Sequence, residues 1–220
     1  MPGNLLVSRP PESLNINGCD YPIDTDFKTC LLIMLAFEDN ELTAAEKQMI
    51  MLDNLYQEKI LSDDIQEAIE KAVWFLDGGQ ASEEKDGSPS PRVFSFSKDD
   101  RLIYAAFRQT HGIDLHTVEL HWWQFISLFM DLGSDSVFCS LVGLRKRVKT
   151  GKASKEEHAL AREMGSIFEV PETDTRTLEE KVKEREFVDR YKTARKRKDE
   201  QRRIRDERRK KQKEGLNGTV

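Results

Sequence analysis

Residues 94–132 read FSFSKDDRLIYAAFRQTHGIDLHTVELHWWQFISLFMDL, and this stretch decides the fold. It contains two of the three Trp and five of the eleven Phe in the 220-residue chain. Two helical patterns flank a corner at Gly112. A segment this rich in aromatic side chains forms the buried centre of a domain. It contains no catalytic constellation, so residue chemistry alone predicts a helical domain and no reaction.

The two helices within this stretch have recognisable ends. Ser97 is expected to cap the first helix, which carries two acids near its positive end and stops at Gly112. The second helix is expected over about residues 118–132, where ten of fifteen residues are apolar. Because that helix is apolar on most sides, we expect it to be buried on most sides.

A β-hairpin is predicted near the N-terminus. Residues 13–23 read SLNINGCDYPI, in which Asn17-Gly18 supplies the two positive-φ positions of a type I′ turn. In that register five apolar side chains share one face, which must lie against helices because an isolated hairpin is marginal in water. They are Leu14, Ile16, Cys19, Tyr21 and Ile23.

Further helices are predicted on both sides of a polar loop at residues 80–93. Capping boxes at Thr43 with Glu46 and at Ser154 with Glu157 start two of them. The expected helices upstream of the loop span about residues 24–39, 43–60 and 62–78, the last one ending at Gly78-Gly79. Downstream they span about 137–148, with Val137, Leu141, Leu144 and Val148 as the apolar stripe, and about 154–168.

The charge of the chain is divided unevenly. Residues 176–214 hold 18 Lys/Arg and 10 Asp/Glu, a balance of +8, whereas the remainder carries 17 − 30 = −13. The sequence therefore predicts a mainly α protein: a compact helical domain with a small N-terminal β-hairpin and a long charged C-terminal helix. Residues 1–12 are expected to be a disordered lead-in, 13–170 the core, 176–214 a basic helical arm and 215–220 a disordered tail.

Metal binding and catalysis find little support in the sequence. His111, His116 and His121 are spaced five residues apart, whereas ligands on one helix need a spacing of three or four. No glycine-rich loop follows a strand, and no Ser or Cys has the context of a nucleophile. We therefore expect no metal, no cofactor and no enzymatic activity.

Two sets of residues are candidates for partner binding. Trp122 and Trp123 are candidate anchors, although core packing of at least one is favoured because neighbouring helical positions point about 100° apart. The basic arm is a candidate nucleic-acid contact through phosphates. Its candidate residues are Arg195, Arg197, Arg202 and Arg205. Acids interrupt the arm, so the alternative is a solvated charged helix.

The compartment is predicted from the cysteines and the longest apolar run. The three cysteines are scattered, which argues against a disulfide framework and for a reducing environment. The longest apolar run, residues 30–37, is far shorter than the roughly 20 residues that a membrane-spanning helix needs. We expect a protein that makes no membrane contact and is found in a cytoplasm.

Three segments, in this order and spacing, resemble the bacteriophage gene-product-fifteen family of Gram-positive phages and prophages. They are ESLNINGCDYPIDTDFKT at residues 12–29, FSFSKDDRLIYAAFRQTHGIDL at 94–115 and LHWWQFISLFMDL at 120–132. The resemblance continues through the helix that ends near Phe168, and it does not include the basic arm.

The resemblance implies a non-enzymatic tail assembly protein in the host cytoplasm, and specifically a chaperone for the tape measure protein or another tail protein. A tape measure protein is a long helical chain with apolar stripes that aggregate unless they are covered. Two alternatives remain open. One is a morphogenesis factor that contacts nucleic acid through the arm, and the other is a structural tail or head-completion component.

Overall fold

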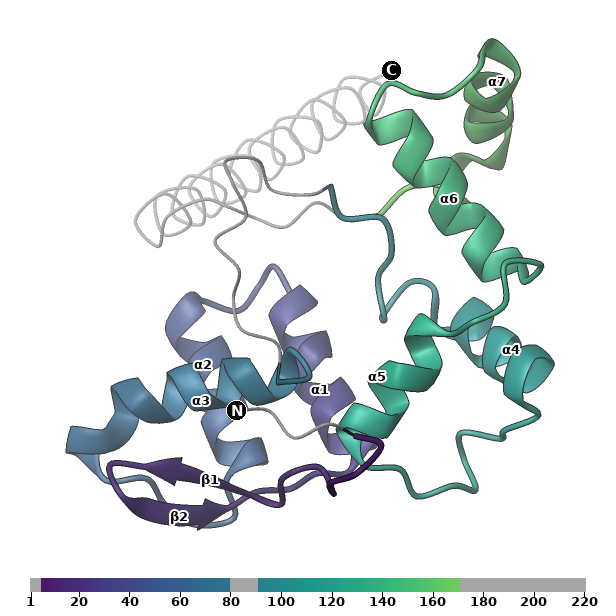
Figure 1. The fold of residues 1–220 in the computed structure, drawn as a ribbon. Helices are drawn as coiled ribbons and strands as arrows, with labels where there is room; N and C mark the ends of the chain where they lie inside the picture. Colours follow the sequence, from purple (N-terminus) through teal and green to yellow (C-terminus); the bar gives the residue numbers. More distant parts are fainter. Residues whose placement is uncertain (1–4, 80–90, 171–220) are drawn as a thin grey trace, which may run out of the picture. The chain divides into compact units, whose positions relative to one another are not determined.

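A computed structural model describes residues 5–79 and 91–170 of the chain. In these residues a two-stranded antiparallel hairpin precedes seven α-helices and two short 3-10 turns (Figure 1), which confirms the predicted fold class. The strands are β1 (Ser13–Ile16) and β2 (Cys19–Pro22). The helices are α1 (Phe27–Glu38), α2 (Ala44–Leu55), α3 (Ile65–Leu76), α4 (Asp100–His111), α5 (Trp122–Met130), α6 (Val137–Lys149) and α7 (Lys155–Met164), with 3-10 turns at Ser62–Asp64 and Gly165–Ile167. The predicted arm at 176–214, the tail at 215–220 and most of the loop at 80–93 lie outside the described residues.

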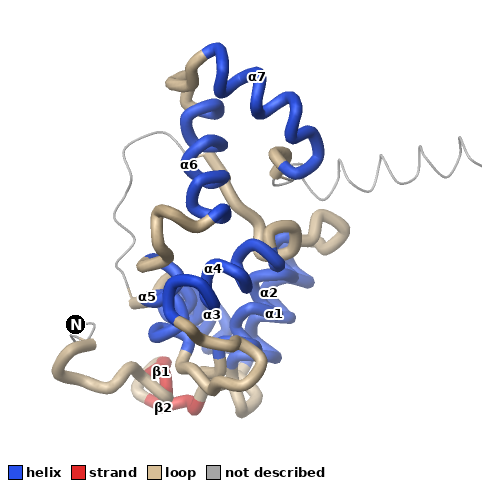
Figure 2. Tube along the Cα trace, turned by 90° about the vertical axis from the view of Figure 1, so that its right-hand side faces the viewer, coloured by secondary structure: helices blue, strands red, loops and turns tan. Residues whose placement is uncertain are grey.

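The hairpin has the predicted register and turn. Leu14 pairs with Tyr21, and the turn residues Asn17 and Gly18 have φ angles of 48° and 86°. Strand β1 packs on α3, as Figure 2 shows for the red strands beside the blue helices. The prediction that Cys19 lies on the buried face is wrong, because Cys19 is exposed. The turn is instead joined to α3 by a polar contact, in which the backbone N–H of Asn17 donates to Glu67 at 2.9 Å.

The last two residues of the predicted lead-in make contacts with the folded body. The carbonyl of Glu12 accepts from the backbone N–H of Ile23 at 3.0 Å. The carbonyl of Pro11 lies 3.1 Å from Nε2 of His121. These bonds join the chain before the hairpin both to β2 and to the start of α5.

Two helix boundaries differ from the prediction because the backbone pairs with a distant segment. Helix α2 ends at Leu55 and not near residue 60, since Tyr56 turns extended and pairs with Ile23. Helix α5 begins at Trp122 and not near residue 118. The residues before it are extended, and the carbonyl of Leu120 accepts from the N–H of Phe27 at 3.0 Å. In both places a tertiary hydrogen bond overrides a local helical pattern.

Helix α6 packs against α4 and α7, and its buried face differs from the predicted stripe. Leu141 and Leu144 are buried as expected, whereas Val137 is 67% exposed and Phe138 takes its place in the core. The fourth position on the buried face is Arg145, a charged residue that the apolar pattern does not predict.

The described residues contain free cysteines only, and none of their helices combines the length and apolar character that crossing a bilayer requires.

Candidate functional site

Trp122 and Trp123, the first predicted anchors, are both buried, with 2% and 3% of their surface exposed. Their indole N–H groups donate to the carbonyls of Leu76 at 2.9 Å and Phe75 at 2.8 Å. These carbonyls belong to the last turn of α3, where helical carbonyls lack a partner within the helix. Both Trp residues therefore close the end of α3 from α5, which favours the core alternative over surface anchors.

The remaining predicted site residues belong to the C-terminal arm. Arg195, Arg197, Arg202 and Arg205 lie outside the described residues. His111 contacts the Leu128 carbonyl at 2.9 Å, while His116 lies in the loop after α4. No group of three or more His, Cys, Asp or Glu in the described part of the chain is placed to hold a metal ion.

His121 has a structural role at the start of α5. Its Nδ1 accepts from the backbone N–H of Trp123 at 3.0 Å, and its own N–H donates to Gln124 at 3.1 Å. Nε2 faces the Pro11 carbonyl and must carry the proton to donate to it. Burial lowers the pKa of His121 below 6.5, against the smaller opposing effect of that carbonyl, so the neutral ring is favoured.

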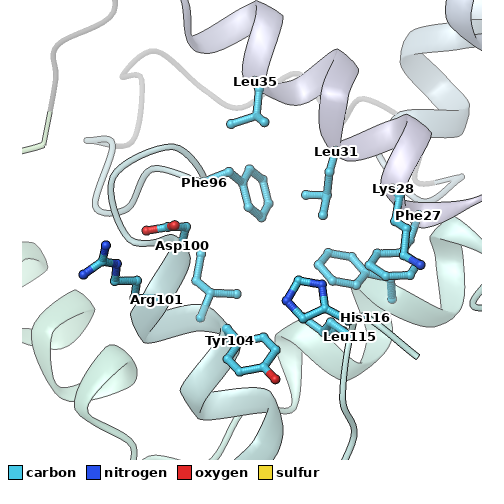
Figure 3. Close-up of a pocket in the computed structure, with 12 residues that line it drawn as sticks. Phe27, Lys28, Leu31, Leu35, Phe96, Asp100, Arg101, Tyr104, Leu115 and His116 are labelled. Carbon is cyan, nitrogen blue, oxygen red and sulfur yellow. The ribbon is translucent and has the colours of Figure 1, made fainter. Parts of the chain in front are cut away.

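An apolar cavity with an open side lies between α1 and α4 (Figure 3). Its volume is about 510 Å³, which is in the range of ligand-binding pockets. The apolar lining comes from α1, the segment before α4, α4 itself, the loop after it, and α5. These residues are Phe27, Leu31, Leu35, Phe96, Ile103, Tyr104, Leu115 and Phe125.

The floor of the cavity is formed by Phe27 and Phe125, which belong to a stack of three aromatic rings. Phe125 of α5 stacks on Phe27 of α1 and on Phe107 of α4, with ring centroids 5.1 Å apart in both pairs. All three rings are almost fully buried. The floor is therefore part of the core, and the apolar side chains above it form the surface that a partner could cover.

Glu38, the last residue of α1, joins this helix to the segment that carries Phe96. Its carboxylate accepts from the Ser95 hydroxyl at 2.6 Å and from the backbone N–H groups of Phe96 and Ser97 at 2.9 and 3.1 Å. It also pairs with Arg92. One carboxylate thus neutralises a cation and satisfies three donors, which fixes this wall of the cavity relative to α1.

Arg145 holds the same segment from behind. Its guanidinium makes a two-pronged ion pair with Asp99, at 2.7 and 3.0 Å. The remaining N–H groups donate to the carbonyls of Val93, Ile167 and Phe168. All five donors of a fully buried side chain therefore have acceptors, which is the condition for burying a charge at tolerable cost.

Asp114 fixes the loop that carries Leu115 and His116. It accepts from the His116 N–H at 3.0 Å, from the Tyr104 hydroxyl at 3.1 Å and from Arg108 at 3.2 Å. The backbone N–H of His116, followed by Tyr104 and Arg108, lowers the pKa of Asp114 below its usual value. The carboxylate therefore stays ionised and keeps this loop against α4.

Charged side chains border the cavity at two places. Figure 3 shows Lys28 and Arg101 at opposite margins. The Lys28 ammonium lies 5.5 Å from the centroid of the Phe27 ring. Asp100 is the one carboxylate in the lining that the structure describes.

Phe125 of the aromatic floor belongs to the segment that the sequence predicts to be buried, whereas the sequence does not indicate the polar residues that fix the walls. Asp99 is one of the two acids expected near the start of the helix that Ser97 is expected to cap, and nothing in the sequence indicates that it pairs with Arg145 or that Glu38 binds Ser95. One signal was available for Arg145, since it follows Leu144 on the apolar side of its helix. No signal identified the cavity, because it depends on the distance between α1 and α4.

Comparison with known proteins gives one match. The family model described as "Bacteriophage Gp15 protein" matches residues 6–170. No curated protein and no solved structure matches the chain. The matched range contains the hairpin, all the described helices and every residue of the cavity. The chain belongs to the bacteriophage Gp15 family.

Proposed function

We propose that this protein is a non-enzymatic phage morphogenesis factor that binds the tape measure protein during tail assembly and keeps it soluble. The observation that carries the proposal is the open apolar cavity between α1 and α4. The buried side-chain polar atoms of the described residues all have hydrogen-bond partners. An apolar surface left open within a well-satisfied structure is typical of a binding site.

The mode of binding follows from the shape and lining of the cavity. Two helices flank it, and a third forms its floor, which suits the helix-in-groove mode, in which an amphipathic helix lays its apolar face between helices. A tape measure protein supplies such helices in long succession. Several copies of an acidic body on one client would also repel one another, which opposes aggregation of the complex.

Co-expression with the tape measure protein of the same phage genome tests the function. We expect the soluble fraction of the tape measure protein to rise, and the two proteins to co-purify. Leu31→Ser should weaken this effect, because Leu31 lines the cavity. Leu32→Ser is the matched control, since Leu32 is the next residue on α1, is 59% exposed and does not line the cavity. An unchanged soluble fraction with the wild-type protein would remove the chaperone proposal.

The two alternative functions give different results in simple assays. Salt-dependent retention on DNA that is lost on deletion of residues 195–220 would favour a nucleic-acid role for the arm. Detection of the protein in purified virions would favour a structural component. A chaperone is expected to leave the particle and to bind its client with or without the arm.

A further inference from the structure

We infer that the cavity between α1 and α4 is selective for a helix whose apolar face is bordered by acidic side chains. The inference rests on the proposed function and adds to it the chemistry of the partner. The evidence is the placement of Lys28 and Arg101, the two cations at its margin.

Both cations occupy positions that helix electrostatics disfavours. Lys28 is the second residue of α1, and Arg101 is the second residue of α4. The first turn of a helix carries partial positive charge, so acids stabilise it and cations do not. The N-cap of α1 is Asp26, and its first turn contains no acid. The N-cap of α4 is Asp99, which pairs with Arg145, and its first turn contains Asp100. Two helices therefore begin at the margin of one cavity, each with a cation as its second residue.

Neither cation is neutralised by an ion pair in the part of the chain that the structure describes. The ion pairs there use Arg92, Arg108, Arg145 and Arg147 as their cations. The Lys28 side chain is exposed, and its ammonium lies over the Phe27 ring, where it remains available to a carboxylate. Asp100 offsets part of this charge, which leaves a balance of +1 among Lys28, Arg101 and Asp100.

The surroundings increase the selectivity. The chain without residues 176–214 has a charge of −13, so most of the body repels an acidic partner. Lys28 also lines a polar hollow, whose other lining residues include Asp24, Asp26 and Glu119. An acid-bordered helix is therefore repelled from that hollow and attracted to the margin that Lys28 and Arg101 form. Charge of this kind contributes to partner choice and association rate as well as to affinity.

The dimensions agree with a helical ligand. Apolar side chains at positions i, i+3, i+4 and i+7 span about 10 Å along a helix, at roughly 1.5 Å per residue. A volume of about 510 Å³ can receive a few such side chains but not a folded domain. Acidic residues that flank the apolar face would then reach Lys28 on one side and Arg101 on the other.

Binding of two synthetic peptides tests the inference. Each is a fluorescein-labelled helix of about 20 residues with the same Leu and Phe at i, i+3, i+4 and i+7, flanked by Glu in one peptide and by Lys in the other. Fluorescence anisotropy with the full-length protein at low salt should show at least about tenfold tighter binding of the Glu peptide. The preference should shrink toward 1 M NaCl, where the screening length falls to about 3 Å.

A charge-matched pair of variants locates the effect. Lys28→Glu/Arg101→Glu should abolish or reverse the preference for the Glu peptide. Lys152→Glu/Arg162→Glu makes the same change in net charge on two exposed cations near α7 and should leave the preference intact. Circular dichroism establishes that both variants are folded. Equal binding of the two peptides to the wild type, or a preference that survives Lys28→Glu/Arg101→Glu, overturns the inference.

The tape measure protein separates failure of this inference from failure of the proposed function. If the wild type and Lys28→Glu/Arg101→Glu solubilise the tape measure protein equally, the chaperone function stands and the acidic selectivity is wrong. If the wild type has no effect, the proposed function fails whatever the peptides show. If the wild type solubilises the tape measure protein and Lys28→Glu/Arg101→Glu does not, the result supports both the chaperone function and the acidic selectivity.

Discussion

Helix α5 lies between two apolar interfaces that differ in one respect. Toward α3, Trp122 and Trp123 are buried and donate to the carbonyls that end α3. Toward α1 and α4, Phe125 forms the floor of a cavity that remains open. Both interfaces are rich in aromatic rings, so composition does not distinguish the closed interface from the open one.

Polar contacts make the difference between the two interfaces. At the closed interface they join the two helices directly, and Gly79 allows the closest approach, since a Cβ there would lie 2.5 Å from the Trp123 ring. At the open interface they lie behind the walls, at Glu38, Arg145 and Asp114. These three braces fix the segments that carry the apolar walls, and an apolar surface on fixed walls remains available to another molecule.

The largest expected effect compares one residue from each interface. Trp122→Ala should lower the free energy of unfolding by about 5 kcal/mol, because it leaves a large void and an unpaired Leu76 carbonyl. Leu35→Ala, at the margin of the open cavity, should cost about 1 kcal/mol or less because its surroundings are already partly solvated. Urea unfolding followed by far-UV circular dichroism measures both. Similar losses would contradict the distinction between a closed and an open interface.

The second effect tests the brace behind the cavity wall. Arg145→Met should cost about 3–4 kcal/mol, since it leaves the buried Asp99 carboxylate without a cation and three carbonyls without donors. Arg145→Met/Asp99→Asn should recover part of this loss by removing the stranded charge. A double variant that is less stable than the sum of the two single variants would contradict this account of the brace.

The closed interface and its helices could be predicted from the sequence in large part. The capping boxes at Thr43 and Ser154 start helices as predicted, and the glycine pair at 78–79 ends α3. Local signals of this kind depend only on neighbouring residues. The early end of α2 and the late start of α5 could not be predicted, since each depends on a backbone hydrogen bond to a segment at least thirty residues away.

The open cavity could not be predicted for a related reason. Its walls are four separate segments, and the braces that hold them join residues far apart in sequence, such as Glu38 with Ser95 and Arg145 with Asp99. An acid at a helix end or an arginine within an apolar stripe has several ordinary explanations. Only the spatial pairing distinguishes a brace from a solvated charge.

The third expected effect is a dependence of stability on pH, which arises from His121 at the closed interface. Because burial lowers this pKa in the folded state below 6.5, the unfolded chain takes up a proton first as the pH falls. The contribution of His121 to the free energy of unfolding is therefore complete above pH 6.5. It is lost progressively below that pH, because protonation of Nδ1 removes the hydrogen bond from the N–H of Trp123. Thermal unfolding of the wild type should show a fall in Tm between pH 7.5 and 5.5. The fall should be smaller in His121→Asn, because Asn can also cap a helix and its side chain does not take up a proton in this range. His116→Asn is the control and should retain the fall.

The smallest expected effect is an increase in Tm, whereas most substitutions lower it. Lys28→Glu and Arg101→Glu should each raise Tm by about 1–3 °C at low salt, because an acid suits the first turn of a helix better than a cation. Lys146→Glu, the same change of charge in the last turn of α6, should lower Tm. Differential scanning fluorimetry at 20 mM and 1 M NaCl measures the three variants, and salt should diminish all three shifts. A residue whose replacement stabilises the fold but weakens binding is retained for binding. A drop in Tm for Lys28→Glu or Arg101→Glu would instead mean that these cations support the fold, and the open interface would lose its strongest evidence of selectivity.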